Sequence, residues 1–352
     1  MKNLLKRSIA ILDSWVLQLT RFHWAFSIIY YTVFNPRFRR ELHAVAAGRA
    51  AYAGAGLGAP LTLLRRNIHR VEKGLTMRPR AALFAEEYIL ETVRAFEKAL
   101  QISADDPVTI RWAHDVLTAY FCAVEAGPSI ADAKRLFDEL SANSTNWPAV
   151  DGNAWSPKPR AKGVISGVTF DDFFRLCEQR RSTRWFLQRL VPKSIVENAI
   201  SAALQAPSAC NRQPFFFRAF LDPKTAAEIS SIAMGTAGYF HQIPALIVVI
   251  GDLGCFPHER DRHVPYIDAS LATMQLMLAL ETMGLASCPI NWPDIETLEQ
   301  RMMRRLELKP YQRPIMLLAV GYPDPSGDIA YSAKKTVPQV TQVVPGEHSV
   351  EK

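Results

Sequence analysis

The chain has 352 residues, 49% hydrophobic and 21% charged, a composition that excludes a disordered or low-complexity protein. This length accommodates one large domain or two of ordinary size. The net charge of +7 is uneven, because residues 1–80 hold 14 Lys or Arg against three acids. The five cysteines are scattered without CxxC spacing, which argues against a disulfide framework and against a zinc or other metal site. Their pattern fits a reducing cytoplasm.

The N-terminal segment is basic and rich in aromatic residues. Its best candidate for a membrane span, residues 22–36, is shorter than the ~20 apolar residues that a span requires. A buried or interfacial helix is therefore expected, and no signal peptide of the usual form is recognisable. Residues 1–80 could contact an anionic membrane surface. The alternatives are a solvated basic face or a contact with a second domain. Nucleic-acid binding is not expected, because no basic recognition motif is present.

Hydrophobic periodicity predicts an all-helical N-terminal domain over residues 1–142. Helices are expected at residues 84–100, 110–126 and 130–142, each with apolar positions at helical spacing. In the first of these, Ile89, Val93 and Phe96 lie on the apolar side. Residues 143–167 are rich in Asn, Ser, Pro and Gly and are interpreted as a linker.

After Thr169, which is a candidate helix N-cap, predicted helices alternate with strands. The helices are expected at residues 170–180, 192–206 and 266–284, the last apolar nearly all round and ended by Gly284. Strands are expected at residues 214–221, 244–252, 285–292 and 314–323. The pattern defines a second domain over residues 168–345.

The stretch "EQRRSTRWF" places three guanidiniums and a hydroxyl within five residues at the end of a helix, at Arg180, Arg181, Ser182 and Arg184. Arginine binds phosphate through paired, charge-assisted hydrogen bonds, so the stretch is a candidate phosphate site. The alternative is solvated surface charge. Lys334 and Lys335, in the C-terminal tail, could complete such a site.

The stretch "QAPSACNRQPFFFRAF" begins 24 residues after Arg181. Pro207 ends the preceding helix, and residues 208–213 form a turn before a buried strand. The side chains of Asn211 and Gln213 offer donors and acceptors that match the edge of a planar heterocycle. The alternative is a turn held by local side-chain hydrogen bonds.

A third stretch, "GLASCPINWPD", follows the long apolar helix. The strand in it is expected to end at Pro289, with the backbone of residues 290–292 exposed at its tip. The alternative is an ordinary strand-to-helix loop. Residues 65–80 form a further basic segment, whose charge density is typical of a functional contact. Their sequence does not indicate a partner. A basic helix face that covers the other domain is the simpler interpretation.

The order and spacing of these stretches resemble the nitroreductase family of FMN flavoproteins. The series runs from "RRSxRxF" through one helix to "APSxxNxQPxxF", then to "IPALIVV", to an apolar helix ending in "GLASC", and to "AVGYP". The resemblance covers about residues 170–340. It implies an α+β fold, with a nitroreductase-like mixed sheet flanked by helices and preceded here by the helical N-terminal domain.

The resemblance also implies a homodimer that binds FMN at the subunit interface. The implied cofactor contacts are Arg180, Arg181, Ser182, Arg184, Pro207, Ser208, Asn211, Gln213, Pro289, Ile290, Asn291, Lys334 and Lys335. Many members of the family have Glu-Gly where this chain has Asn291-Trp292. Tyr239, His241 and Trp292 are candidates for the substrate pocket, and Arg212 is a candidate for positive charge near the flavin.

The implied function is an FMN-dependent NAD(P)H oxidoreductase of the cytoplasm, either free or peripheral to a membrane. Hydride would pass from NAD(P)H through flavin N5 to a small nitro, quinone or enone-like acceptor in a ping-pong cycle. The flavin carries this chemistry, so no catalytic side chain is required. The alternative is a non-catalytic or specialised flavin-fold subunit of a biosynthetic assembly at a membrane surface.

Overall fold

The computed structural model describes residues 13–18, 20, 22–54, 58–101, 106–125, 127–143 and 154–344. Part of the predicted linker, residues 144–153, and the first twelve residues therefore lie outside the described part. The helices are α2 (Trp24–Ile29), α3 (Arg39–Ala53), α4 (Gly58–Thr76), α5 (Ile89–Gln101), α6 (Pro107–Ala123), α7 (Pro128–Asn143), α8 (Phe170–Gln179), α9 (Lys193–Ala203), α10 (Pro223–Ser230), α11 (Val264–Thr282), α12 (Glu296–Leu306) and α13 (Val337–Val340). The strands are β1 (Phe215–Phe220), β2 (Ala245–Asp252), β3 (Ala286–Asn291) and β4 (Gln312–Gly321).

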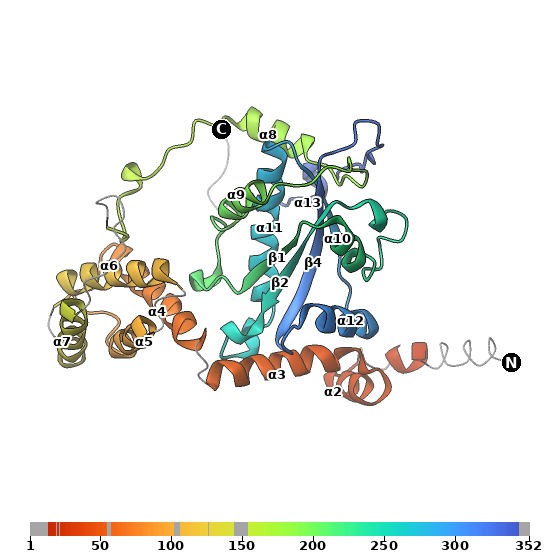
Figure 1. The fold of residues 1–352 in the computed structure, drawn as a ribbon. Coiled ribbons are helices and arrows are strands. Elements are labelled where there is room, and N and C mark those ends of the chain that lie inside the picture. Colours follow the sequence, from red (N-terminus) through yellow and green to blue (C-terminus); the bar gives the residue numbers. More distant parts are fainter. Residues whose placement is uncertain are drawn as a thin grey trace, which may run out of the picture.

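Helices α4 to α7 form a bundle with its own core, beside the sheet-containing part in Figure 1. The apolar face predicted for α5 is confirmed, because Ile89, Val93 and Phe96 are fully buried there. The hydroxyl of Tyr120 on α6 donates a hydrogen bond of 2.7 Å to the carbonyl of Phe84. Helix α3 does not contribute to this core, so the helical N-terminal region has two structural parts.

The four strands pair antiparallel in the order β1-β2-β4-β3, and all four occupy predicted positions. An isolated parallel bridge joins Ser182 to Ser287 at the β3 edge, outside the four antiparallel strands, so the mixed sheet that was expected is antiparallel in its named strands. Strand β2 is buried on both faces, as a central strand between two helical layers must be.

Alternation along β2 shows how the layers are built. Ala245 and Ile247 pack toward α9 and α11, whereas Leu246 and Val248 pack toward α10 and α12. The sheet therefore lies between two helical layers, and α11 spans its length (Figure 1). Helix α11 ends as predicted, with Gly284 in the left-handed conformation at φ 76°.

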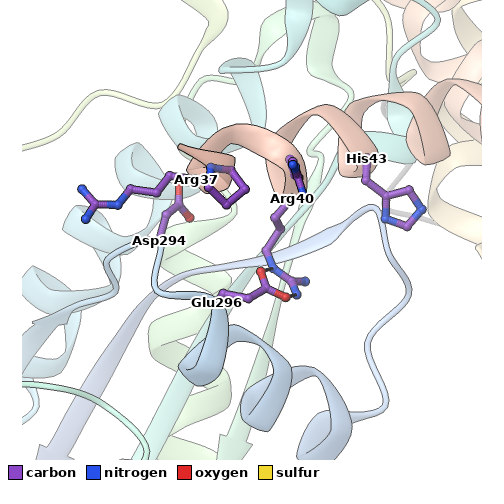
Figure 2. A pocket seen from close by; sticks show the side chains of 7 residues that line it. Arg37, Arg40, His43, Asp294 and Glu296 are labelled. Atoms are coloured by element: carbon purple, nitrogen blue, oxygen red, sulfur yellow. Dashed lines mark hydrogen bonds and ion pairs between the residues drawn. The ribbon is translucent and has the colours of Figure 1, made fainter. Parts of the chain in front are cut away.

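Helix α3 lies across one end of the sheet-containing part (Figure 1). Gly48 permits this close approach, because a Cβ atom there would lie 2.8 Å from the backbone of Leu253. At the N-terminal end of α3, the guanidinium of Arg40 forms a paired ion contact with Glu296 at the start of α12. One of the nitrogen–oxygen distances is 2.6 Å. Figure 2 shows this pair, with Arg37 and His43 on either side of it. Helix α3 of the N-terminal region is thus held against the sheet-containing part by close packing and by an ion pair.

The uncharged N-terminal stretch forms the short helix α2 followed by a π-helix, η1 (Tyr30–Phe34). In the described part of the chain, no helix combines the length and the apolar character needed to cross a membrane.

Candidate flavin site

The arginine-rich stretch follows α8 and joins the edge of the sheet. Helix α8 begins at the predicted cap, where Thr169 Oγ1 accepts a hydrogen bond of 3.2 Å from the Asp172 amide. It ends at Gln179, and the chain becomes extended at Arg180. The Thr183 amide then donates to the Ser287 carbonyl at 3.1 Å. This pairing brings the first predicted stretch against the beginning of β3.

Arg180 and Arg184 lie close to the buried thiol of Cys288. Burial raises the pKa of Cys288, while both guanidiniums act to lower it. Burial also raises the pKa of Tyr239 to about 12, and the Tyr239 hydroxyl lies 4.0 Å from the Cys288 sulfur. Tyr239, a predicted pocket residue, therefore belongs to the same cluster as the two arginines. Its hydroxyl is protonated at neutral pH and is available as a hydrogen-bond donor.

Two buried polar atoms in this cluster have no hydrogen-bond partner among the described residues. They are the Nε of Arg180 and the Oγ of Ser287. A buried donor left unpaired costs about 1–3 kcal/mol, more when it is charged. Unpaired buried donors of this kind are therefore suited to a ligand with several acceptor oxygens. These donors fit the phosphate of FMN.

Arg181 contacts the C-terminal tail of the chain. Its guanidinium donates to the backbone carbonyls of Ala330, at 2.7 Å, and Tyr331. It thereby ties the C-terminal tail to the arginine stretch. Lys334 and Lys335 follow three and four residues after Tyr331, and both are exposed. The C-terminal tail with Lys334 and Lys335, the fourth predicted stretch, is therefore held beside the first.

The third stretch differs from its prediction. Strand β3 does not end at Pro289 but continues to Asn291, and Ile290 pairs with Leu317 of β4. The backbone of residues 290–291 is therefore held in the sheet and is not an exposed tip. Pro289 and Asn291 have exposed side chains, whereas Ile290 is buried in the core. The sequence prediction failed because Pro289 was interpreted as a strand end, although its side chain points outward at the edge of the sheet.

The other two predicted pocket residues are placed separately. Trp292 is buried, 7% exposed, and its indole Nε1 donates to Glu299 at 2.8 Å. It belongs to the core under the sheet and does not form an aromatic lid in this structure. His241 is exposed, and its ring lies against Phe240 with centroids 5.9 Å apart.

The second stretch is a tightly bonded turn on α11. Ser208 Oγ donates to the Asp268 carboxylate at 2.7 Å, and the Ala209 amide donates to the same oxygen at 3.0 Å. Ser208 Oγ also accepts from the Gln213 amide at 2.8 Å. The side chains of Gln213 and Asn211 bond to each other at 3.0 Å. Local hydrogen bonding, the alternative interpretation of this stretch, thus accounts for part of the polar cluster. Pro207, the residue before the turn, has an exposed ring.

This turn is conformationally strained. Cys210, Asn211 and Gln213 have φ angles of 52°, 49° and 50°, a region that residues other than glycine seldom occupy. Each such residue costs about 1–3 kcal/mol, and such strain gathers at functional sites. From the helical bundle, Arg65 Nε donates to the carbonyl of Asn211 at 3.1 Å. The turn is therefore held from two sides, by α11 and by α4.

The structure brings together the first, third and fourth predicted stretches but not the second. Within the described residues, no contact joins the arginine cluster to the turn at Ser208. The arginine cluster lies at the C-terminal end of α11, whereas Asp268 lies near the N-terminal end of that helix.

Three residues that form contacts in these two clusters have no role assigned from the sequence. They are Asp268, Ser287 and Arg65, the last being part of the basic segment without a predicted partner. The sequence does contain a sign that Asp268 has a specific role, because its carboxylate lies alone on the apolar face of α11.

Comparisons with known proteins concern the C-terminal half of the chain. Two overlapping segments, residues 177–237 and 225–322, match the model of the family described as Nitroreductase family. Iodotyrosine deiodinase 1 of Mus musculus is 26% identical over 204 residues, which cover 49% of this chain and 70% of that protein. A putative NADH dehydrogenase/NAD(P)H nitroreductase of Archaeoglobus fulgidus is 29% identical over 161 residues, covering 45% and 89%.

Similar folds occur among solved structures. An FMN-dependent nitroreductase from Clostridium difficile is 21% identical with a TM-score of 0.41, covering 47% of this chain and 96% of that one. A nitroreductase family protein from Streptococcus pneumoniae is 25% identical with a TM-score of 0.42, covering 49% and 100%. Residues 177–322 thus match the nitroreductase family, as the sequence motifs predicted.

Proposed function

We propose that the C-terminal domain is an FMN-dependent oxidoreductase that takes electrons from NAD(P)H and passes them to a small organic acceptor. The observation that carries the proposal is the unpaired, buried Nε of Arg180 beside Arg184, within a domain that matches the nitroreductase family. The name of the Archaeoglobus fulgidus relative is consistent with an NAD(P)H donor. Nitro compounds, quinones and enones are the acceptor classes proposed.

In this proposal Arg180, Ser182 and Arg184 hold the FMN phosphate through charge-assisted hydrogen bonds. Ser287 Oγ supplies one more hydroxyl at the same place. When bound, the flavin supplies the hydride-transfer chemistry. The protonated hydroxyl of Tyr239 stands beside Arg184 and can donate one hydrogen bond without losing its proton.

Purified protein tests the proposal directly. A yellow sample that bleaches under NAD(P)H and recovers in air supports an oxidoreductase. A sample that binds flavin but is not reduced by NAD(P)H would favour a specialised flavin-fold subunit with another electron donor. A colourless sample that takes up no added FMN would overturn both functions.

The phosphate assignment has its own test. Changing Arg180 and Arg184 to alanine removes contacts of about 1.5–3 kcal/mol each, so FMN should bind at least about 100-fold more weakly. The matched control is Arg175→Ala with Lys193→Ala, which removes two exposed cations from neighbouring helices. Equal flavin content in the two double variants would refute the assignment.

We further propose that the active form is a homodimer. Helix α8 has no buried residue, and its Phe170, Phe173 and Phe174 are 75%, 49% and 50% exposed. Helix α11 likewise exposes Ile267 and Leu271 on the face opposite its core contacts. Apolar surface of this extent is typical of an interface. A second copy that covers it could also bring its own Ser208 turn to the arginine cluster.

Sedimentation analysis of Leu271→Asp tests the dimer. A charge on this face should yield a monomer that also loses FMN, while Met234→Asp, at another exposed apolar position, should remain dimeric with its flavin. A monomeric wild-type protein that retains FMN would contradict the proposal.

A peripheral membrane contact of the N-terminal segment is a third part of the proposal. Phe22, Trp24, Val33 and Phe34 are 67%, 69%, 66% and 63% exposed. Aromatic and apolar side chains of this kind prefer the membrane–water interface, and the basic residues of the same region favour anionic lipid.

Vesicle pelleting tests the membrane contact with the full chain. Trp24→Ser with Val33→Ser should reduce pelleting with phosphatidylserine vesicles, without change in the thermal unfolding midpoint. Met234→Ser with Val337→Ser removes two equally exposed apolar side chains elsewhere and is the control. Absence of wild-type pelleting would refute the contact.

A further inference from the structure

A cluster of cations from two parts of the chain lines a cavity of about 290 Å³ between α4 and the strained turn. We call it the arginine pocket. Its charged lining residues are Arg66, Arg70, Lys73, Arg212, Arg260 and Asp261. Five of these side chains are cationic and one is a carboxylate. Such an excess of like charge in one cavity is unfavourable unless an anion compensates it.

The α4 side of the pocket is formed by one face of the helix. Arg66, Arg70 and Lys73 are spaced four and three residues apart, so their side chains project from the same side. Arg70 is held in place by Tyr88, whose ring centroid lies 3.7 Å from the guanidinium carbon. Among the described residues, the side chains of Arg66 and Lys73 form no hydrogen bond or ion pair. Both cations are therefore available to a ligand.

The opposite side is formed by the turn after α9 and the loop after β2. Arg212 is only 7% exposed; it donates to the Cys255 carbonyl, and its guanidinium carbon lies 4.8 Å from the centre of the Phe256 ring. Burial and the nearby charge of Arg66 lower the pKa of Arg212. A buried guanidinium facing a second cation is costly, and a bound anion would relieve both effects.

Asp261 offsets little of this charge. Its carboxylate lies 3.9 Å from the guanidinium of Arg260, which is 77% exposed at the mouth of the pocket. Arg66 and Arg212 form no ion pair among the described residues, although the charge of Asp261 acts to raise the pKa of Arg212. One carboxylate therefore faces five cations in the pocket.

We propose that the arginine pocket binds the phosphate group of a second ligand, in addition to the flavin phosphate proposed at Arg180. Guanidiniums that approach from two walls suit a tetrahedral dianion with three or more acceptor oxygens better than a planar carboxylate. The volume is at the small end of ligand sites, roughly 300–1,000 Å³, so the pocket holds one charged group and not a whole dinucleotide. That group is carried either by a soluble phosphate ester or by a lipid headgroup.

Titration calorimetry with inorganic phosphate, at constant ionic strength, tests the site in the full chain. The variant Arg66→Gln with Lys73→Gln keeps polar side chains with amide N–H donors and removes two charges. The control Arg94→Gln with Lys98→Gln removes two exposed cations from α5. Phosphate should bind wild type and control equally and bind the pocket variant at least tenfold more weakly. Equal binding by all three proteins, or none by wild type, would overturn the inference.

Vesicles separate the two sources of phosphate. If the ligand is a lipid headgroup, wild type and control pellet with phosphatidic acid vesicles more than the pocket variant, and inorganic phosphate competes. If the ligand is soluble, the three proteins pellet alike while the calorimetric difference persists. Either result supports the pocket and identifies its ligand.

Measuring the flavin content of the same samples distinguishes a failure of this inference from a failure of the proposed enzyme function. The pocket variant should retain as much FMN as wild type, because Arg180 and Arg184 are unchanged. If it loses FMN together with phosphate binding, the pocket holds the cofactor phosphate itself and the inference fails. A protein without flavin would refute the enzyme but would leave the phosphate titration intact.

Discussion

Ser208 is the residue on which the strained turn depends most directly. Its hydroxyl donates to Asp268 at 2.7 Å and accepts from the Gln213 amide at 2.8 Å. Alanine at this position leaves the Gln213 amide unpaired and removes one of two hydrogen bonds to the carboxylate. An unsatisfied buried donor costs about 1–3 kcal/mol and a bond to a charged acceptor is worth about 1.5–3 kcal/mol. Because both hydrogen bonds are only partly buried, we expect a loss of about 2–4 kcal/mol, less than the full sum.

That loss is comparable to the cost of the conformation that Ser208 maintains. Cys210, Asn211 and Gln213 all have positive φ, at about 1 kcal/mol or more each. Ser208→Ala should therefore let the turn relax. The assay is hydrogen exchange at the Gln213 amide, which should lose most of its protection, combined with urea unfolding.

Ser201→Ala is the matched control, because that hydroxyl donates only to a carbonyl on the exposed face of α9. Its effect on the free energy of unfolding should stay within about 0.5 kcal/mol. If the Gln213 amide keeps its protection in Ser208→Ala, the turn is held by other contacts and the reasoning is wrong.

Three further results are expected. Glu299→Gln removes the negative charge 3.1 Å from the buried Arg313 guanidinium but leaves Asp294 as a second carboxylate, so the loss in the free energy of unfolding should be at most about 3–5 kcal/mol; a loss below that of a surface pair, about 1 kcal/mol, would contradict a buried ionic role. Gly48→Ala should destabilise the docking of α3 by about 1–3 kcal/mol, whereas Gly235→Ala, with open space around it, should not; urea unfolding of both decides. The raised pKa of Tyr239, about 12, gives a stabilising contribution that is complete below about pH 10 and is lost as the pH rises toward the folded value. Ultraviolet titration of wild type against Tyr239→Phe should show one phenol fewer ionising above about pH 11, and a difference near pH 10 would exclude the shift.

Local pattern was sufficient for most secondary structure in the C-terminal half. The four strands lie where apolar runs and turn residues placed them, and Thr169 and Gly284 cap the helices as expected. These features depend on neighbours within a few residues, which is why sequence alone could locate them. The end of β3 was predicted wrongly, because pairing with β4 is not a local property.

Residue types alone identified the arginine stretch, the polar turn and the nitroreductase resemblance, since each is a local chemical pattern. Only the tertiary structure decided which of them meet: Arg184 with Tyr239, Ser208 with Asp268, and Arg65 with Asn211. It also placed Trp292 in the core and turned the basic face of α4 toward Arg212. Contacts between residues 60 to 150 positions apart depend on how helices and sheet pack, and a one-dimensional pattern does not record that packing.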